Sequence, residues 1–244
     1  MRIGLFIPCY IDQLYPNVGR ATVAVLERLG HEIGFPEAQT CCGQPMCNSG
    51  YARMATGLVD AFAAQFRAYE RVIAPSASCI LHLKENLETQ SQPLAHRIFE
   101  LSEFLHDEVP EADWARLDAR FPHRVGLHAS CHGLRGLGLG SPSECMIPGF
   151  SKPARLLRGV AGLELVELDR ADECCGFGGT FSVLEADVSA AMGRDRVADH
   201  TRHGAEYITS VDMSCLMHLG GLVERGTGRP RIIHLAEILA SSLL

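Results

Sequence analysis

The sequence has no uninterrupted hydrophobic run approaching the roughly 18 residues that a membrane-spanning helix needs. It also lacks a Lys/Arg-rich run, and its formal net charge is −7, which argues against nucleic acid as the main partner. The opening stretch, MRIGLFIPCY, is too short and too strand-like for a signal peptide. We therefore expect a cytoplasmic protein with no transmembrane segment and no nucleic-acid partner.

Nucleotide-binding fingerprints are missing as well. No P-loop string is present, and two glycine-rich stretches, GLRGLGLGS and CCGFGGTF, each fail the dinucleotide pattern. Where that pattern needs a third glycine, the chain has Ser141 in the first stretch and Phe181 in the second. The sequence therefore contains no signature of a nicotinamide or flavin site.

Cysteine is abundant instead, with ten in 244 residues. An apolar content of 47% is enough for a real core, so these cysteines are not needed as disulfide staples. In a reducing compartment, clustered cysteines indicate metal or redox chemistry. Two adjacent cysteines followed by glycine occur twice, in TCCGQP (40–45) and ECCGFG (173–178).

The two Cys-Cys-Gly motifs belong to an internal repeat that covers both halves of the chain in the same order. The other matches are RIGLFIPC (2–9) with RVGLHASC (124–131), SCILHL (78–83) with SCLMHL (214–219), and RIFELSEFL (97–105) with RIIHLAEIL (231–239). The second half is longer between its first two matches, and GLGSPSECMIPGF (138–150), rich in turn formers, is the candidate insertion.

Both halves alternate strand-like and helix-like segments. The expected strands are 2–7, 71–75, 124–127 and 206–210, and the expected helices are 18–29, 51–66 and 181–200. This alternation predicts an α/β protein of two similar Rossmann-like cysteine-rich domains with parallel sheets, related by a pseudo-two-fold axis. We place the domains at residues 1–110 and 123–244, with a linker at 111–122.

Ligand crevices in α/β sheets form where the loops leave the carboxyl ends of parallel strands. Each half has one cysteine after its first strand, a Cys-Cys-Gly in its middle and one cysteine after a later strand. We therefore expect two sites, one per half. The first quartet is Cys9, Cys41, Cys42 and Cys79, and the second quartet is Cys131, Cys174, Cys175 and Cys215.

Adjacent cysteines on an extended strand would point to opposite faces, so the chain must turn for both to face one object. A following glycine permits the unusual dihedral angles of such a turn. A single zinc ion is usually held by cysteines two to four residues apart, whereas a multi-metal cluster offers neighbouring thiolates separate metal corners. The pattern favours an iron–sulfur cluster in each half. Zinc, buried structural cysteines and disulfides are the alternatives.

Several residues near the quartets are ambiguous. Cys47 and Cys145 have no counterpart in the other half and are expected to be bystanders, although Cys47 is close enough to Cys42 to add a ligand. His82 and His218 each follow the last cysteine of their half by one helical turn, either as packed residues or as hydrogen-bond partners of a cluster. Two more residues adjoin the second quartet. His132 matches Tyr10, so a ligand role shared by both halves is not expected, and Arg135 either balances cluster charge or lies on the surface.

Five strings carry a family resemblance that covers nearly the whole chain: PCYIDQLYPNVG, TCCGQP, NSGY, SCHGLRGLG and ECCGFGGTFSV. They resemble the lactate-utilization protein A family, within the Cys-Cys-Gly domain proteins that include the cysteine-rich subunit of heterodisulfide reductase. Other relatives are the iron–sulfur subunits of glycolate oxidase and anaerobic glycerol-3-phosphate dehydrogenase. The resemblance implies an iron–sulfur electron-transfer subunit of a complex that oxidises L-lactate to pyruvate, with other iron–sulfur subunits as partners.

The chain departs from the wider group at one point. There the motif ends in Cys-x-x-Cys, but the first position of that pair is Ser76 in one half and Asp212 in the other. Four cysteines per site then fit a 4Fe-4S cluster better than the large non-cubane cluster of heterodisulfide reductase. No residue of this chain is expected to be catalytic. The alternatives are a heterodisulfide-reductase-like thiol/disulfide redox subunit and a zinc-stabilised assembly module without a redox role.

Overall fold

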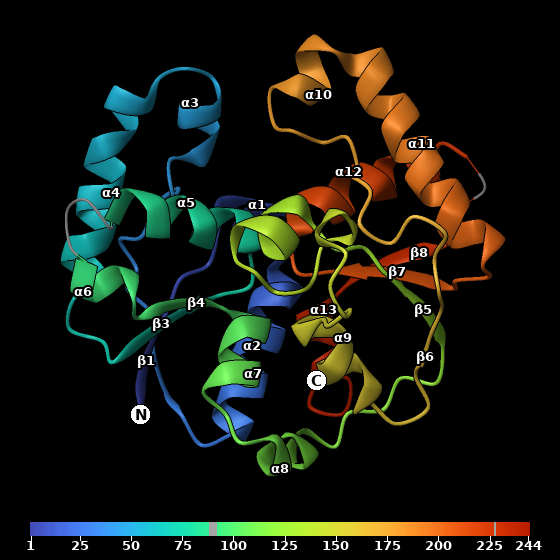
Figure 1. Cartoon of the computed structure of the whole chain (residues 1–244). Helices are drawn as coiled ribbons and strands as arrows, with labels where there is room; N and C mark the ends of the chain where they lie inside the picture. The colour runs from blue at the N-terminus through green and yellow to red at the C-terminus, as the bar shows by residue number, and fades with distance from the viewer. Residues whose placement is uncertain (88–91, 227) are drawn as a thin grey trace.

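The computed structural model describes residues 1–87, 92–226 and 228–244, and it contains one four-stranded sheet from each half of the chain (Figure 1). The strands are β1 (Arg2–Leu5), β2 (Glu32–Gly34), β3 (Arg71–Ala74), β4 (Ile98–Glu100), β5 (Arg124–Leu127), β6 (Glu164–Leu165), β7 (Tyr207–Ser210) and β8 (Arg231–His234). The sheet orders are β2-β1-β3-β4 and β6-β5-β7-β8, and every neighbouring pair is parallel. The same order in both halves confirms the predicted α/β fold of two similar parallel-sheet domains.

Helices connect the strands in both halves. Those of the first half are α1 (Cys9–Leu14), α2 (Pro16–Arg28), α3 (Gln44–Asn48), α4 (Ala52–Phe66), α5 (Ala77–Leu87), α6 (Gln92–Ala95) and α7 (Leu101–Asp107). Between the sheets lie α8 (Glu111–Trp114) and the short helix η1 (Ala115–Leu117). Those of the second half are η2 (His132–Gly136), η3 (Ser143–Cys145), α9 (Lys152–Arg158), α10 (Phe181–Leu184), α11 (Ala186–Arg202), α12 (Met213–Glu224) and α13 (Leu235–Leu239).

The local sequence explains these elements. In β3, Val72, Ile73 and Ala74 are all buried, and a continuous apolar run is typical of a parallel strand covered on both faces. Helix α2 begins at Pro16, whose missing N–H costs nothing in the first turn of a helix. It ends just before Gly30, which adopts a φ of 88° and turns the chain away.

Two segments differ from the sequence-based expectation, and a third, the expected linker, contains short helices. The helix expected over 181–200 is divided into α10 and α11, because Glu185 adopts non-helical dihedral angles. The first strand ends at Leu5 instead of residue 7, since the N–H of Ile7 donates to the side chain of Gln39 (2.7 Å) and not to a strand. The segment expected as a linker, 111–122, contains α8 and η1.

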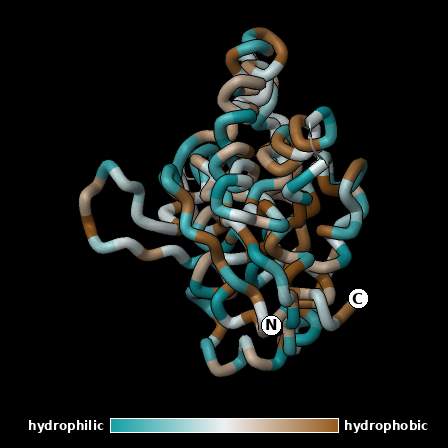
Figure 2. The backbone as a smooth tube through the Cα atoms, turned by 90° about the vertical axis from the view of Figure 1, so that its right-hand side faces the viewer, coloured by the Kyte–Doolittle hydropathy of each residue, from teal (hydrophilic) through white to brown (hydrophobic). Residues whose placement is uncertain are grey.

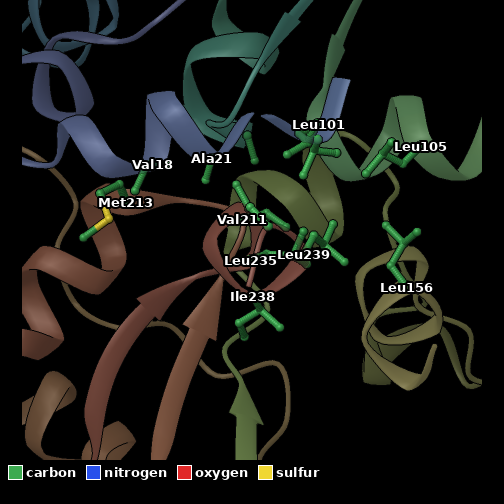
Figure 3. Close-up of a cluster of buried hydrophobic side chains, with 14 of the residues drawn as sticks. Val18, Ala21, Leu101, Leu105, Leu156, Val211, Met213, Leu235, Ile238 and Leu239 are labelled. Carbon is green, nitrogen blue, oxygen red and sulfur yellow. The ribbon is translucent and has the colours of Figure 1, made fainter. Parts of the chain in front are cut away.

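The two halves share a hydrophobic core (Figure 3). Val18 and Ala21 of α2, from the first half, lie on the same core as Leu235 and Leu239 of α13, from the second half. The reciprocal contact joins α7 of the first half to α9 of the second. Because each half packs helices against helices of the other, the halves are held in one arrangement by apolar burial.

A direct backbone contact lies between the equivalent loops after β3 and β7. Ser76 and Asp212, which occupy matching positions of the repeat, form an antiparallel bridge with each other. A contact between equivalent residues of two similar halves is what a pseudo-two-fold axis produces. The bridge therefore places this axis at the carboxyl ends of β3 and β7.

Hydrophobic and hydrophilic residues are interspersed along the whole tube in Figure 2. Among the residues described, none of the helices has both the length and the hydrophobicity that crossing a bilayer requires. Both termini lie away from α3 and α10, which are at the opposite end of the molecule (Figure 1).

Candidate metal centre

The first quartet lies at the carboxyl end of the first sheet. Cys9 is the first residue of α1 and follows β1 closely, whereas Cys79 lies in the first turn of α5 after β3. Cys41 and Cys42 occupy the loop before α3. The Sγ atoms of Cys42 and Cys79 are 3.4 Å apart, and the thiol of Cys41 is hydrogen bonded to those of Cys9 and Cys42. The structure thus brings all four predicted cysteines together.

The second quartet repeats this arrangement on the second sheet. Cys131 lies between β5 and η2, and Cys215 lies in the first turn of α12 after β7. The thiol of Cys174 is hydrogen bonded to those of Cys131 and Cys175, and the thiol of Cys175 is also hydrogen bonded to that of Cys215. The matched geometry follows from the matched strand order, because equivalent loops leave equivalent strand ends.

The glycine of each Cys-Cys-Gly motif turns the chain so that both thiols face the site. Gly43 has a φ of 95° and Gly176 a φ of 87°, a region that side-chain-bearing residues rarely adopt. Each glycine also donates its backbone N–H to the first sulfur of its pair, over 3.4 Å to Cys41 and 3.3 Å to Cys174. The motif therefore supplies the turn and a hydrogen bond to sulfur.

Crowding makes the thiols of one quartet titrate unequally. Hydrogen bonds from Cys42 and Cys9 lower the pKa of Cys41, and the same contacts together with burial raise the pKa of Cys9 and of Cys42. In the second quartet, hydrogen bonds from Cys131 and Cys175 lower the pKa of Cys174, the counterpart of Cys41. Four sulfurs this close cannot all become thiolates unless a positive charge lies among them. Each quartet therefore has the chemistry of a cation site, in which bound metal displaces the thiol protons.

Both quartets line one cavity of about 330 Å³ between the halves. The sequence predicts two separate sites, and the structure places them on the walls of this shared space. Tyr10 and Gln44 of the first half and His132 and Phe177 of the second also line it. Gln44 Nε2 lies 3.3 Å from His132 Nε2, so the two halves are in polar contact at the cavity wall.

Comparison with known proteins identifies the family of this chain. The family model named cysteine-rich domain matches the chain twice, over residues 3–84 and 125–220. Three relatives named lactate utilization protein A match almost end to end. They come from Geobacillus sp. strain WCH70 (40% identity, 99% of this chain and 100% of the relative), Geobacillus thermodenitrificans strain NG80-2 (42%, 98% and 98%) and Bacillus velezensis (39%, 99% and 100%). The chain belongs to the lactate utilization protein A family.

One solved structure aligns with 99% of this chain and 86% of its own. It is an ABC transporter solute binding protein from Agrobacterium vitis bound with α-D-tagatopyranose. The TM-score is 0.27 and the sequence identity 12%, values too low to say anything about this member of the lactate utilization protein A family.

The backbone bridge between Ser76 and Asp212 joins the two halves of this family member. The Asp212 carboxylate is 1% exposed and accepts hydrogen bonds from the Ser78 N–H (2.9 Å), the Ser78 hydroxyl (2.9 Å) and the Ser214 hydroxyl (3.2 Å). Burial raises the pKa of Asp212. Ser76 and Asp212 both line the cavity and contribute polar groups to its wall.

The two unmatched cysteines lie outside the cavity lining. Cys145 is exposed on η3. Cys47 lies on α3, with its Sγ 4.0 Å from Nε2 of the buried His82. Burial lowers the pKa of His82. Cys47 thus contacts this imidazole and does not line the cavity with the first quartet, and its role as a bystander stays a prediction.

Arg135 and His218 are partnered by protein groups. Arg135 pairs with Glu144 (2.6 Å) and Asp172 (3.2 Å) on the surface of the second half. His218 lies with Nε2 3.3 Å from the Ser189 carbonyl oxygen, and burial lowers its pKa. Arg135 also interacts electrostatically with Cys131, and His218 with Cys174, so both side chains act on the second quartet through charge.

The sequence reasoning overlooked His128. This residue is fully buried, and one of its ring nitrogens lies within 4.8 Å of the Sγ atoms of Cys175 and Cys215. Burial lowers the pKa of His128 to about 3, so its ring is neutral. The available signal was a mismatch inside the repeat, because RIGLFIPC has Phe6 where RVGLHASC has His128.

Proposed function

We propose that this chain is an iron–sulfur electron-transfer subunit that acts with partner subunits in the oxidation of L-lactate to pyruvate. The observation that carries the proposal is the convergence of four cysteines at the same place in each half. Its relatives are named for lactate utilization, which supports lactate as the source of the electrons.

The residues present fit one four-iron cluster per half. The first quartet would supply four thiolates to one cluster, and the second quartet would supply four to the other. Such a cluster accepts and releases one electron at a time. The N–H groups of Gly43 and Gly176 already point at sulfur, and such hydrogen bonds stabilise negative charge on a thiolate.

Partners follow from the balance of the reaction. Oxidation of lactate to pyruvate releases two electrons and two protons, and some group must remove hydrogen from the substrate carbon. The cavity walls of this chain present all eight quartet thiols, and these would be occupied by metal. We therefore assign the substrate step to partner subunits, themselves iron–sulfur proteins, and the electron relay to this chain.

Anaerobic purification followed by iron and acid-labile sulfide analysis tests the cofactor. The expected result is a brown protein with about four iron and four sulfide per half. Zinc in stoichiometric amount without sulfide would overturn the proposal and leave a zinc-stabilised assembly module. Material handled in air is a poor sample, because clusters decay and emptied thiolate sites bind zinc.

The shared cavity favours a second candidate, a thiol/disulfide redox subunit like heterodisulfide reductase. A space of about 330 Å³ between the quartets matches the lower end of small-molecule sites. A disulfide held there would take two electrons and two protons, its S–S bond would break, and two thiols would leave. Reduced viologen can supply the electrons in an assay with a small organic disulfide. Viologen oxidation that depends on the disulfide would favour this candidate, and its absence would remove it.

A further inference from the structure

A groove between α11 and α12 lies apart from the cavity that the quartets line. The two helices contact each other in the second half (Figure 1), and residues at their surface enclose a space of about 660 Å³. The less exposed part of its lining is apolar and consists of Ala190, Val197, Leu222 and Val223. These side chains form the floor of the groove.

The charge of the groove has one sign. Every charged side chain in its lining is an exposed arginine: Arg194, Arg202, Arg225 and Arg229. Asp195 and Glu224 adjoin Arg194 and Arg225 in the sequence but do not line the groove, because consecutive residues of a helix point about 100° apart. A chain with a formal net charge of −7 therefore gathers cations at this place.

Two of these arginines are not neutralised by the chain itself. Arg202 forms an ion pair with Asp169 at 2.6 Å. The side chains of Arg194 and Arg225, by contrast, form no hydrogen bond or ion pair with any residue that the structure describes. The groove thus presents unpaired positive charge beside an apolar floor, which fits an occupant that is acidic and apolar at once.

The place of the groove on its helices narrows the kind of anion. Arg202 is the last residue of α11 and Arg225 directly follows α12, so both lie where helix carbonyl groups carry partial negative charge. That field opposes a small anion such as phosphate, which is favoured at the opposite end of a helix. Nucleic acid commonly uses on the order of 6–10 phosphate contacts, more than these arginines supply. Carboxylates spaced along a protein segment remain.

We propose that this groove binds an acidic amphipathic helix of a partner subunit, with the apolar face of that helix on the floor and its carboxylates on Arg194 and Arg225. The inference rests on the proposed function for the identity of the partner. The lining runs from Ala190 to Arg202 along α11, about 18 Å, the length of about three helical turns. Such helices bind grooves through apolar side chains three and four residues apart. Because α12 also carries Cys215, the partner would be anchored on a helix of the second metal site.

Charge reversal tests the groove. The full chain, purified anaerobically, is titrated with its purified partner iron–sulfur subunits, and the dissociation constant is measured. The double variant Arg194→Glu, Arg225→Glu should bind about tenfold more weakly, because two attractive pairs become repulsive. High salt should weaken wild-type binding, since exposed charges are screened. The control double variant Arg120→Glu, Arg158→Glu changes net charge equally at exposed arginines outside the groove and should bind like the wild type.

Overlapping synthetic peptides that cover the partner subunits identify the bound segment. The peptide that binds should have a net negative charge and one apolar face, and it should not bind the groove variant. Equal affinity of the wild type and the groove variant for the partner would overturn the inference, and so would a wild-type chain that binds no partner subunit. Arginine-dependent binding of single-stranded RNA or of phosphatidylglycerol vesicles, with partner binding unchanged, would assign the groove to that ligand instead.

Iron and sulfide analysis of the same samples separates this inference from the proposed function. Both double variants should keep full iron and sulfide, because the groove is remote from the quartets in the cavity, and this content also shows that they are folded. Full iron together with unchanged partner affinity would overturn the inference alone. Wild-type protein without iron and sulfide would overturn the proposed function, while the titration would still decide the groove.

Discussion

At the scale of single residues, the four sulfurs of a quartet occupy two environments. Cys42 and Cys175, the second members of the adjacent pairs, are 3% exposed, and Cys79 and Cys215 are 8% exposed. The other members of each quartet are only half-buried. The buried cysteines pack on the hydrophobic cores, and the half-buried ones are open to the shared cavity. A group held by such a quartet has one side in protein and one side toward the cavity.

Substituting one buried cysteine should empty one site only. Cys42→Ser removes a thiolate from the first quartet and leaves the second untouched, so about half of the bound iron should be lost. Iron and sulfide analysis of anaerobically purified protein measures this. Cys47→Ser and Cys145→Ser are the matched controls and should keep full iron content. Equal iron loss in Cys47→Ser and Cys42→Ser would show that the ligand assignment of the first half is wrong.

At the scale of elements, the turn of the Cys-Cys-Gly loop requires glycine. In Gly176→Ala, the new Cβ would lie 2.6 Å from the Ser189 carbonyl oxygen of α11, at a φ of 87°. We expect a loss of about 1–3 kcal/mol in the free energy of unfolding and weaker metal binding in the second site. Urea titration and iron analysis provide the measurements.

The control for this substitution is Gly57, which lies on the exposed face of α4 with no atom near its would-be Cβ. Gly57→Ala should stabilise the protein by about 0.5–1 kcal/mol, because alanine is the better helix former. A similar gain in Gly176→Ala would mean that the Cys-Cys-Gly loop does not depend on the left-handed conformation.

The helices that end the two halves begin with the same kind of cap but different ionisable groups. Glu100 caps α7 by accepting from the N–H groups of Ser102 (2.7 Å) and Glu103 (3.2 Å). Burial raises the pKa of Glu100 to about 8. His234 caps α13 at the equivalent position, and burial lowers its pKa to about 4.

Stability should therefore fall as pH rises through the range set by Glu100. Below pH 4.5 this carboxyl is protonated in both states, and its contribution is lost as pH rises toward 8 because the folded state must bury the charge. Glu100→Gln has no such charge. We expect the wild-type free energy of unfolding to fall by about 1–3 kcal/mol relative to Glu100→Gln between pH 5 and pH 8. Parallel pH profiles for the two proteins in urea titrations would contradict the assignment.

At the scale of the whole molecule, two similar halves enclose one cavity. The packing of α2 on α13 and of α7 on α9 fixes the halves so that the quartets face the same space. Clusters held by the two quartets, as proposed above, would exchange electrons across this cavity without movement of the halves.

The isolated chain should not oxidise lactate, even with both sites filled. The reaction needs a group that accepts hydrogen from the substrate carbon, and we assign that group to partner subunits. The measurement is reduction of an artificial electron acceptor by L-lactate, with reconstituted chain alone and with the partner iron–sulfur subunits added. Activity is expected only in the second assay. Turnover by the chain alone would reveal a catalytic site within it.

The sequence by itself determined the architecture and the members of each quartet. The repeat predicts two similar halves, alternating apolar strands and helices predict parallel sheets, and cysteines at strand ends predict convergence. These patterns are local and periodic along the sequence. They determine which faces of the strands and helices are apolar, and therefore which faces are buried. The helix expected over 181–200 was too long, because the non-helical dihedral angles of Glu185 interrupt it without disturbing the apolar periodicity of the sequence.

Only the tertiary structure decided what surrounds each quartet. Nothing in a one-dimensional pattern places Cys42 and Cys175 on one cavity, since that depends on how α2, α7, α9 and α13 pack across the halves. The same holds for His128. In the sequence, nothing separates His128 from other residues at the end of a buried strand. The packing of β5, α11 and α12 places it beside Cys175 and Cys215. Contacts between distant segments arise from the shape complementarity of whole elements, which no single segment encodes.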